Sequence, residues 1–405
     1  MLLQPRQSPT AAAIGYSPVD PGAAMADIDT QHFLTTADAF SAELESLPDE
    51  KKVIAKVNRH LMPLFFSLSL LCSLDRANLS FAALQLNKDL GFSKEVYGFG
   101  SGVFFLGYAC FQIPATLFCA RIGAPLFLGV SLACWGVVAS CFATLQSSTQ
   151  FFILRFILGL CETGAYPGMW YHMHLFFNDQ ELGVGYATVS TATAVNGVIG
   201  GPIAAALLSL DGFAGLRGWQ WLFLLEGVPA VVLGGVLWKR LARSPTSAGF
   251  LSQQERAWLQ RRQAQAQQDR EADEERGAKA GEPERWWHFA RQWRIWYLAL
   301  IWTLVTTAMD GLVFWVPTII SSVIYLDDDE DDGDESARHE ETEHAAKSAL
   351  LSAIPFGCAA ITMVMVARHS KAARERHLHG AIPLVIAGLG FTLLPLAGPL
   401  HLGLR

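Results

Sequence analysis

The sequence predicts an all-α integral membrane protein with about nine transmembrane helices. Hydrophobic residues make up 51% of the chain and charged residues only 17%, against about 25% charged residues in an average soluble domain. The apolar residues gather into runs of about 20, the length that a helix needs to cross a bilayer. These runs are continuously apolar and do not alternate with polar residues, which excludes a transmembrane β-barrel.

The apolar runs divide the chain into four parts. A disordered cytosolic tail is expected over 1–57, a six-helix N-terminal bundle over 58–239 and a cytosolic linker over 240–292. A partial C-terminal bundle of three helices follows over 293–405, with an acidic loop at 327–346. The runs lie at 61–84, 96–118, 124–145, 150–176, 183–209, 219–238, 295–325, 348–367 and 380–400.

Basic residues predict how the chain is oriented. They gather before the first run (Lys51, Lys52), in the linker, and between the last two runs (Arg368, Arg376), whereas the intervening loops hold few. Cytosolic loops of membrane proteins carry an excess of Lys and Arg, so the N-terminus is expected in the cytosol, most simply at the plasma membrane. The linker holds a capping-box pattern, Ser252 to Glu255, which predicts an amphipathic helix.

Two charges interrupt the first apolar run. Asp75 and Arg76 are the only charged residues within 61–84. A charge at membrane depth costs roughly 2.5–3.5 kcal/mol on insertion scales, and such charges usually face a bundle interior or a water-filled cavity. We interpret this pair as one wall of a polar cavity; the alternative is a pair that ends the helix or extends outward to the interface.

Several stretches together resemble one transporter family. The first helix carries LDRANLSFAAL at 74–84, and the stretch 87–93 precedes the second helix. Further matching pieces follow in order at 155–168, 198–202, 218–227, 314–317 and 354–355, with Arg376 and His379 in the next loop. As a set they are similar to the anion:cation symporter family of the major facilitator superfamily. That family includes bacterial tartrate, phthalate and sugar-acid transporters and fungal allantoate and vitamin permeases. The resemblance implies two six-helix halves that alternate access to a central site, with the second half incomplete here.

Some residues depart from the family pattern. Asp310 stands where the seventh helix often has Tyr, and Lys371 stands where an Asp commonly follows Ser370. The acidic segment at 327–346 is foreign to the pattern. These departures leave open a truncated membrane protein that does not transport, or a sensor.

The substrate-binding candidates are Arg76, Tyr166 and Asn196. The guanidinium group of Arg76 can bind a carboxylate with two hydrogen bonds and stays charged at biological pH, and the resemblance implies the same role. Tyr166 lies four residues after Glu162, on nearly the same helix face. Asn196 is a polar group inside an apolar run, and its alternative role is a hydrogen bond between helices.

Asp75 and Glu162 are the proton-coupling candidates, and the resemblance assigns proton transfer to these positions. A substrate anion at Arg76 would screen that cation from its carboxylate partner, which would then bind a proton more readily. Arg155 lies seven residues before Glu162, roughly 10 Å along the helix, too far to pair with it. We expect Arg155 to pair with Asp75 as a gating or structural partner, with an interfacial position as the alternative. Glu226 is interpreted as a structural family marker.

The sequence therefore predicts proton-coupled symport of small organic anions, carboxylates above all. The alternatives are a protein that does not transport, or an anion exchanger that works without protons. No nucleotide-binding glycine loop or nucleophile motif appears, so an enzyme is not expected. We expect no cofactor besides the proton gradient, no metal, no nucleic acid and a monomer in the lipid bilayer.

Overall fold

A computed structural model describes residues 48–279, 291–324, 335–373, 375 and 377–402, and helices with short turns account for all of them. Contacts divide the chain into Met1–Asp49 and Glu50–Arg405. All the described helices belong to the second of these units. The disordered tail predicted from the sequence lies, over residues 1–47, outside the described residues.

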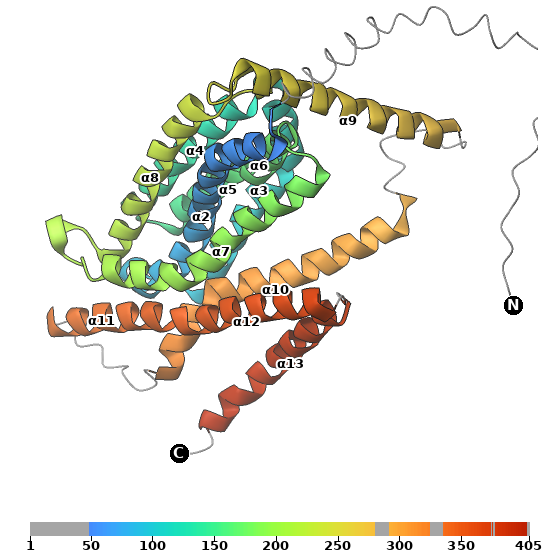
Figure 1. The fold of residues 1–405 in the computed structure, drawn as a ribbon. Coiled ribbons are helices and arrows are strands. Elements are labelled where there is room, and N and C mark those ends of the chain that lie inside the picture. The colour runs from blue at the N-terminus through green and yellow to red at the C-terminus, as the bar shows by residue number, and fades with distance from the viewer. Residues whose placement is uncertain (1–47, 280–290, 325–334, 374, 376, 403–405) are drawn as a thin grey trace, which may run out of the picture. The chain divides into compact units, whose positions relative to one another are not determined.

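The first helices of this unit pack into one bundle (Figure 1). Within it α4 packs against α8, α3 against α5, and α2 against α7. The elements are α2 (Glu50–Leu90), α3 (Lys94–Ile122), α4 (Ala124–Cys141), the short η1 (Phe142–Thr144), α5 (Ser148–Glu162), α6 (Ala165–His174), α7 (Asp179–Leu208) and α8 (Gly218–Arg240).

Helix α2 begins before the predicted start of the bundle. Glu50 opens it in the first turn, where a carboxylate interacts favourably with the helix dipole. Val53 and Val57 are fully buried, four residues apart on one face. The prediction that the tail extends to residue 57 is therefore wrong, because an apolar stripe extends the helix beyond the membrane-length run.

The fourth predicted span, 150–176, is broken into α5 and α6. Pro167 has no amide hydrogen to donate to the carbonyl of Thr163 four residues earlier, and its ring crowds that carbonyl. The helix accordingly stops at Glu162, and Thr163 and Gly164 form a turn before α6 begins. The hydroxyl of Thr163 donates to the Tyr108 carbonyl at 2.5 Å. The break therefore places Glu162 at a helix end within the bundle.

Glycine brings α3 and α5 together. A Cβ on Gly159 would lie 2.1 Å from the carbonyl oxygen of Phe104, and one on Gly107 would lie 2.4 Å from that of Phe156. Only glycine lets the two backbones approach so closely. This contact sets the charged side chains of α5 against α3.

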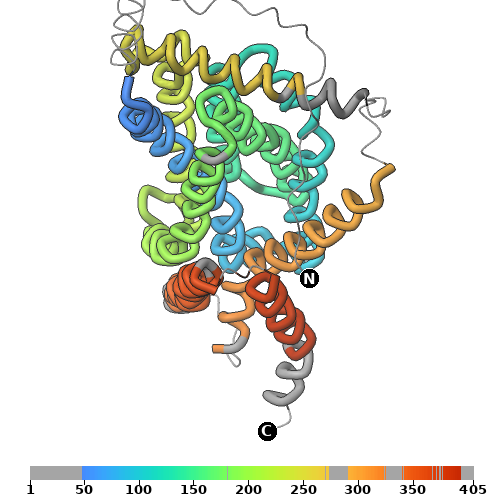
Figure 2. Tube along the Cα trace, turned by 45° about the vertical axis from the view of Figure 1, so that its right-hand side comes forward, coloured from blue at the N-terminus to red at the C-terminus, as the bar shows by residue number. Residues whose placement is uncertain are grey.

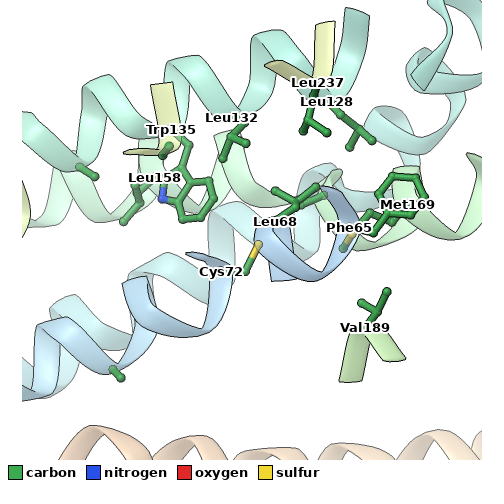
Figure 3. Packing of buried hydrophobic residues seen from close by; sticks show 14 of the residues in the cluster. Phe65, Leu68, Cys72, Leu128, Leu132, Trp135, Leu158, Met169, Val189 and Leu237 are labelled. Carbon is green, nitrogen blue, oxygen red and sulfur yellow. The ribbon is translucent and has the colours of Figure 1, made fainter. Parts of the chain in front are cut away.

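The bundle core lies between α2 and α4 (Figure 3). There Phe65, Leu68 and Cys72 of α2 face Leu132 and Trp135 of α4, and none of these side chains is more than 2% exposed. Helix α2 also packs against α6, α7 and α8. Asp75 and Arg76 of α2 are thus surrounded by other helices, as expected for charges at membrane depth.

The remaining helices follow the linker. Helices α11 and α12 are separated only by Ser352 and lie nearly end to end (Figure 1), and both pack against α7. Figure 2 follows the same trace from a second direction. The helices are α9 (Gln253–Lys279), α10 (Trp293–Ile324), α11 (Glu335–Leu351), α12 (Ala353–Ala373) and α13 (His377–Leu402).

The predicted acidic loop at 327–346 is only partly described. Residues 327–334 lie outside the described part, whereas 335–346 are helical. Ala345 and Ala349 of α11 are buried, and a Cβ on Gly201 of α7 would lie 2.3 Å from the Ala349 carbonyl oxygen. A loop is therefore wrong for the second half of this segment, because a face of small residues packs on α7.

Among the described residues, seven helices are long and apolar enough to cross a membrane. Nine spans were predicted from the sequence. The α5–α6 break divides one of them into two shorter helices, and the described apolar part of α13, His377–Leu393, is also shorter. The all-α membrane architecture is confirmed.

The linker helix α9 is attached to the bundle by charged contacts. Lys56 of α2 donates to Glu255, and Arg262 pairs with Glu181 of α7 at 2.9 Å. The Arg262 guanidinium also lies 5.3 Å from the ring centroid of Trp258. These contacts hold the start of α9 against the N-terminal ends of α2 and α7.

Acid should loosen this attachment. The hydrogen bond from Lys56, together with one from the Ser252 backbone, lowers the pKa of Glu255 below its usual 4.5. Because the folded-state pKa is depressed, the stabilisation is present above that value and is lost as pH falls through the folded pKa. We expect amide exchange in α9, corrected for its intrinsic rate, to rise below about pH 4. Glu255→Gln should remove most of that rise; an unchanged rise would contradict the assignment, and Glu271→Gln on the same helix is the control.

Candidate functional site

A cavity of about 890 Å³ lies between the bundle of helices α2 to α8 and helix α10. This volume is in the range of small-molecule binding sites. Helices α2, α3, α6 and α7 form one side and α10 forms the other. The polar lining side chains are Arg76, Ser101, Tyr108, Gln112, Tyr166, Ser190, Thr306, Thr307 and Asp310.

Arg76 is paired at the edge of this cavity. Its Nη2 donates to Glu162 Oε1 at 2.7 Å, and the side chain is 23% exposed while that of Glu162 is 0% exposed. The guanidinium carbon lies 5.5 Å from the centroid of the Tyr108 ring. Glu162 thus pairs with Arg76 from within the bundle, outside the cavity lining, and the guanidinium group still reaches the cavity.

Asp75 faces away from the cavity lining. It is 3% exposed, and Trp135 Nε1 of α4 donates to its Oδ1 at 3.1 Å. The tryptophan therefore fixes one oxygen of this carboxyl group within the bundle. The adjacent residues Asp75 and Arg76 consequently have different partners on different helices.

Arg155 does not form the predicted ion pair with Asp75 among the described contacts. It is 1% exposed, and its guanidinium donates to the carbonyls of Gly100 at 3.4 Å and Ser101 at 3.5 Å. It also lies 4.7 Å from the ring centroid of Phe104. The backbone of α3 is the nearer acceptor because glycine lets α5 approach it, so Asp75 interacts with Arg155 only through space. The alternative of an interfacial Arg155 does not hold either.

Glu226 joins this buried group of acids. It is 5% exposed on α8, and it lies beside Asp75 and the amide of Asn78. Within hydrogen-bonding geometry neither of its oxygens has a partner in the described part of the chain. Sequence reasoning treated Glu226 as a family marker and did not place it next to Asp75.

A neutral amide should be tolerated at this position. Glu226→Gln keeps the shape of the side chain and removes a like charge beside Asp75, so we expect thermal unfolding of the purified protein at or above the wild-type midpoint. Glu226→Lys, which buries a longer cation, should lower it by several degrees. A drop of more than about 5 °C in Glu226→Gln would instead indicate an ionised Glu226 held by a cation.

The other two substrate candidates differ in position, because Tyr166 lines the cavity and Asn196 does not. Tyr166 lines the cavity, and its hydroxyl lies 3.2 Å from Ser69 Oγ. Asn196 is 7% exposed, is absent from the described lining, and donates from Nδ2 to the Ser73 carbonyl of α2 at 2.8 Å. The amide nitrogen of Asn196 therefore joins α7 to α2, which was the alternative role, and substrate binding by Asn196 stays a prediction.

Sequence reasoning missed the aromatic walls of the cavity. Tyr108, Trp170, Trp302 and Trp315 line it. In the sequence they are aromatic residues inside apolar runs, a pattern that core positions share. Only the tertiary structure, which sets α10 opposite α3 and α6 across the cavity, distinguishes them.

Contacts join the bundle to α10 and α11 next to the cavity residues Phe314 and Trp315. Tyr97 donates to the Phe314 carbonyl at 3.0 Å and meets the ring of Trp315 edge-on, with 5.4 Å between centroids. Gln85 donates to Thr342 at 3.3 Å. Gln85 lies near the C-terminal end of α2 and Tyr97 near the N-terminal end of α3, whereas residues 293–300, at the start of α10, are exposed.

A family model identifies the chain. The Major Facilitator Superfamily model matches residues 65–404, which include every described residue that lines the cavity. The chain belongs to this superfamily. The expectation from the sequence motifs is confirmed, and so is the expectation that the chain is not an enzyme.

Two relatives with similar sequences are also named as transport proteins. A protein of Agrobacterium vitis, provisionally named for tartrate transport, is 33% identical over 345 residues, which cover 85% of this chain and 71% of that protein. The inner membrane transport protein RhmT of Escherichia coli is 30% identical over 351 residues, covering 85% of this chain and 75% of that protein.

A solved structure shows the same fold. It is the crystal structure of a bacterial homolog of the human lysosomal transporter Spinster, in an inward-facing and occupied conformation. The TM-score is 0.55 at 17% identity, and the match covers 78% of this chain. This chain spans 61% of the length of that solved transporter.

Proposed function

We propose that this protein is a secondary transporter that couples the movement of small organic anions, chiefly carboxylates, to protons. The observation that carries the proposal is the 2.7 Å pair between Arg76 and the fully buried Glu162 at the edge of the cavity. A cation that reaches the cavity and an acid behind it provide an anion site and a proton site in direct contact.

Arg76 binds the anion. Its side chain has donors beyond the one used by Glu162, and Nε is buried with no partner among the described residues. A substrate carboxylate can therefore accept hydrogen bonds from the guanidinium group in competition with Glu162. Tyr166, also in the lining, can add a hydroxyl donor.

Glu162 carries the proton. When the substrate carboxylate takes over the positive charge of Arg76, the fully buried Glu162 loses its only described ion-pair partner. A carboxylate without a compensating charge in a low-dielectric site is strongly unfavourable, so proton binding accompanies substrate binding. Asp75, fixed by Trp135, is the second proton candidate.

The contacts between α3 and α10 suggest how access to the cavity alternates between the two sides of the membrane. We infer that the Tyr97–Phe314 contact closes the cavity at the end away from the linker helix α9. With the N-terminus in the cytosol, this conformation opens to the cytosol, and opening the other end requires those contacts to separate. The tartrate name of one relative supports a carboxylate substrate, and the inner-membrane name of another supports the plasma membrane.

Uptake by the purified full chain in proteoliposomes tests the proposal. Labelled tartrate and a panel of mono- and dicarboxylates are supplied with and without an inward proton gradient. We expect gradient-driven accumulation that a protonophore abolishes. Counterflow that persists without any gradient, alongside accumulation insensitive to the protonophore, would indicate an anion exchanger. No uptake of any panel member would indicate a protein that does not transport.

A further inference from the structure

The cavity has a second charge on its opposite wall. Asp310 of α10 lines the same cavity as Arg76 of α2. It is half-buried, and the two side chains interact electrostatically across the cavity. Among the described lining residues these are the only charged ones. The site thus presents a cation on one wall and an anion on the other.

The carboxyl group of Asp310 has no direct partner among the described residues, and Arg76, the cation across the cavity, is already paired. Glu162 neutralises Arg76 at 2.7 Å, and within the described part of the chain no ion pair or hydrogen bond reaches the Asp310 carboxyl group. A carboxylate that faces a partly dehydrated cavity without a counter-charge favours a ligand that brings one. A ligand that carries only a carboxylate would meet repulsion at this wall.

The surroundings of Asp310 suit a cationic nitrogen. Trp302, Thr306, Asp310 and Phe314 follow one another at four-residue spacing and therefore share one face of α10, and all four line the cavity. Trp315 lies on the same wall. Aromatic rings beside a carboxylate attract an ammonium group through the ring face as well as through the charge.

We propose, resting on the proposed function, that the substrate is a small carboxylic acid that also carries a protonated amine or another cationic nitrogen. Its carboxylate pairs with Arg76 and its cation pairs with Asp310. Such a ligand connects α2 to α10 and compensates the charges of both walls at once. Binding by an amphoteric acid would thus draw the two sides of the cavity together.

A matched pair of probes tests this assignment. The probes are para-methylbenzoate and para-(aminomethyl)benzoate, which have the same ring and carboxylate and differ in an amine that is protonated at about pH 7. Binding to the full purified chain is measured by calorimetry. We expect the amine-bearing probe to bind about tenfold or more tightly, as one charge-assisted hydrogen bond allows.

Substitutions at Asp310 test whether this residue causes the preference for the amine-bearing probe. Asp310→Asn should remove the preference for the amine-bearing probe and leave the affinity for para-methylbenzoate unchanged or tighter. Asp310→Ser is a second variant with a different side-chain volume, and Glu271→Gln, on α9 outside the cavity, is the matched acid-to-amide control. Thermal unfolding confirms that each variant is folded.

The outcomes separate this inference from the proposed function. Equal affinity for both probes, or a preference that survives in both Asp310 variants, overturns the assignment of a cationic substrate. If para-methylbenzoate then still binds and depends on Arg76, the proposed anion site stands. Absence of binding by either probe at about 10 mM also overturns the assignment, while the carboxylate uptake panel judges the proposed function separately.

Discussion

Arg76→Ala should reduce the affinity for carboxylate substrates by about 100-fold or more. Two charge-assisted hydrogen bonds, each contributing roughly 1.5–3 kcal/mol, are lost with the guanidinium group. Arg76 is the only cation among the described residues that line the cavity, so no neighbour in that lining can replace it. Calorimetric titration of the purified chain with para-methylbenzoate measures the loss.

The same substitution leaves Glu162 buried without its cation, which would destabilise the fold by about 3–5 kcal/mol. The double variant Arg76→Ala with Glu162→Gln removes that unpaired charge and separates folding from binding. Arg217→Ala is the control, because Arg217 pairs with Asp89 at 3.1 Å and is absent from the described lining. A folded double variant that keeps wild-type affinity would rule out Arg76 as the anion site.

The sequence predicts part of this site because a charge inside an apolar run is costly wherever the fold places it. Asp75 and Arg76 stand out for this reason from the sequence alone. The sequence could not assign their partners, Trp135 and Glu162, because partners depend on how helices rotate against one another. Adjacent residues on a helix point about 100° apart, so one pair of charges reaches two separate neighbours.

The two arginines show the limit of local reasoning. Arg76 and Arg155 both lie in apolar helices, and both were expected to pair with carboxylates. Arg76 does so, whereas Arg155 bonds to carbonyls of α3. The difference comes from Gly100 and the close α3–α5 contact, which no pattern within α5 alone reveals. Helix ends were missed for a similar reason, since Val53 and Val57 are buried only by neighbouring helices.

Glu162→Gln should separate substrate binding from proton coupling. Glutamine can still accept a hydrogen bond from Arg76, but it cannot gain or lose a proton. A pH difference of one unit is a tenfold proton ratio, so one-to-one symport accumulates substrate about tenfold in the wild type. We expect accumulation in Glu162→Gln to fall to about the external concentration, while counterflow of labelled substrate across the same vesicles continues.

Asp75→Asn distinguishes the two proton candidates. The introduced amide keeps an oxygen acceptor for the Trp135 indole, so the local packing can persist. If Glu162 is the coupling group, this variant retains gradient-driven accumulation, because the Arg76–Glu162 pair is intact. Loss of accumulation in Asp75→Asn with retention in Glu162→Gln would move the proton site to Asp75. The coupling would then act through the backbone of α2, since Asp75 and Arg76 are adjacent and have different partners.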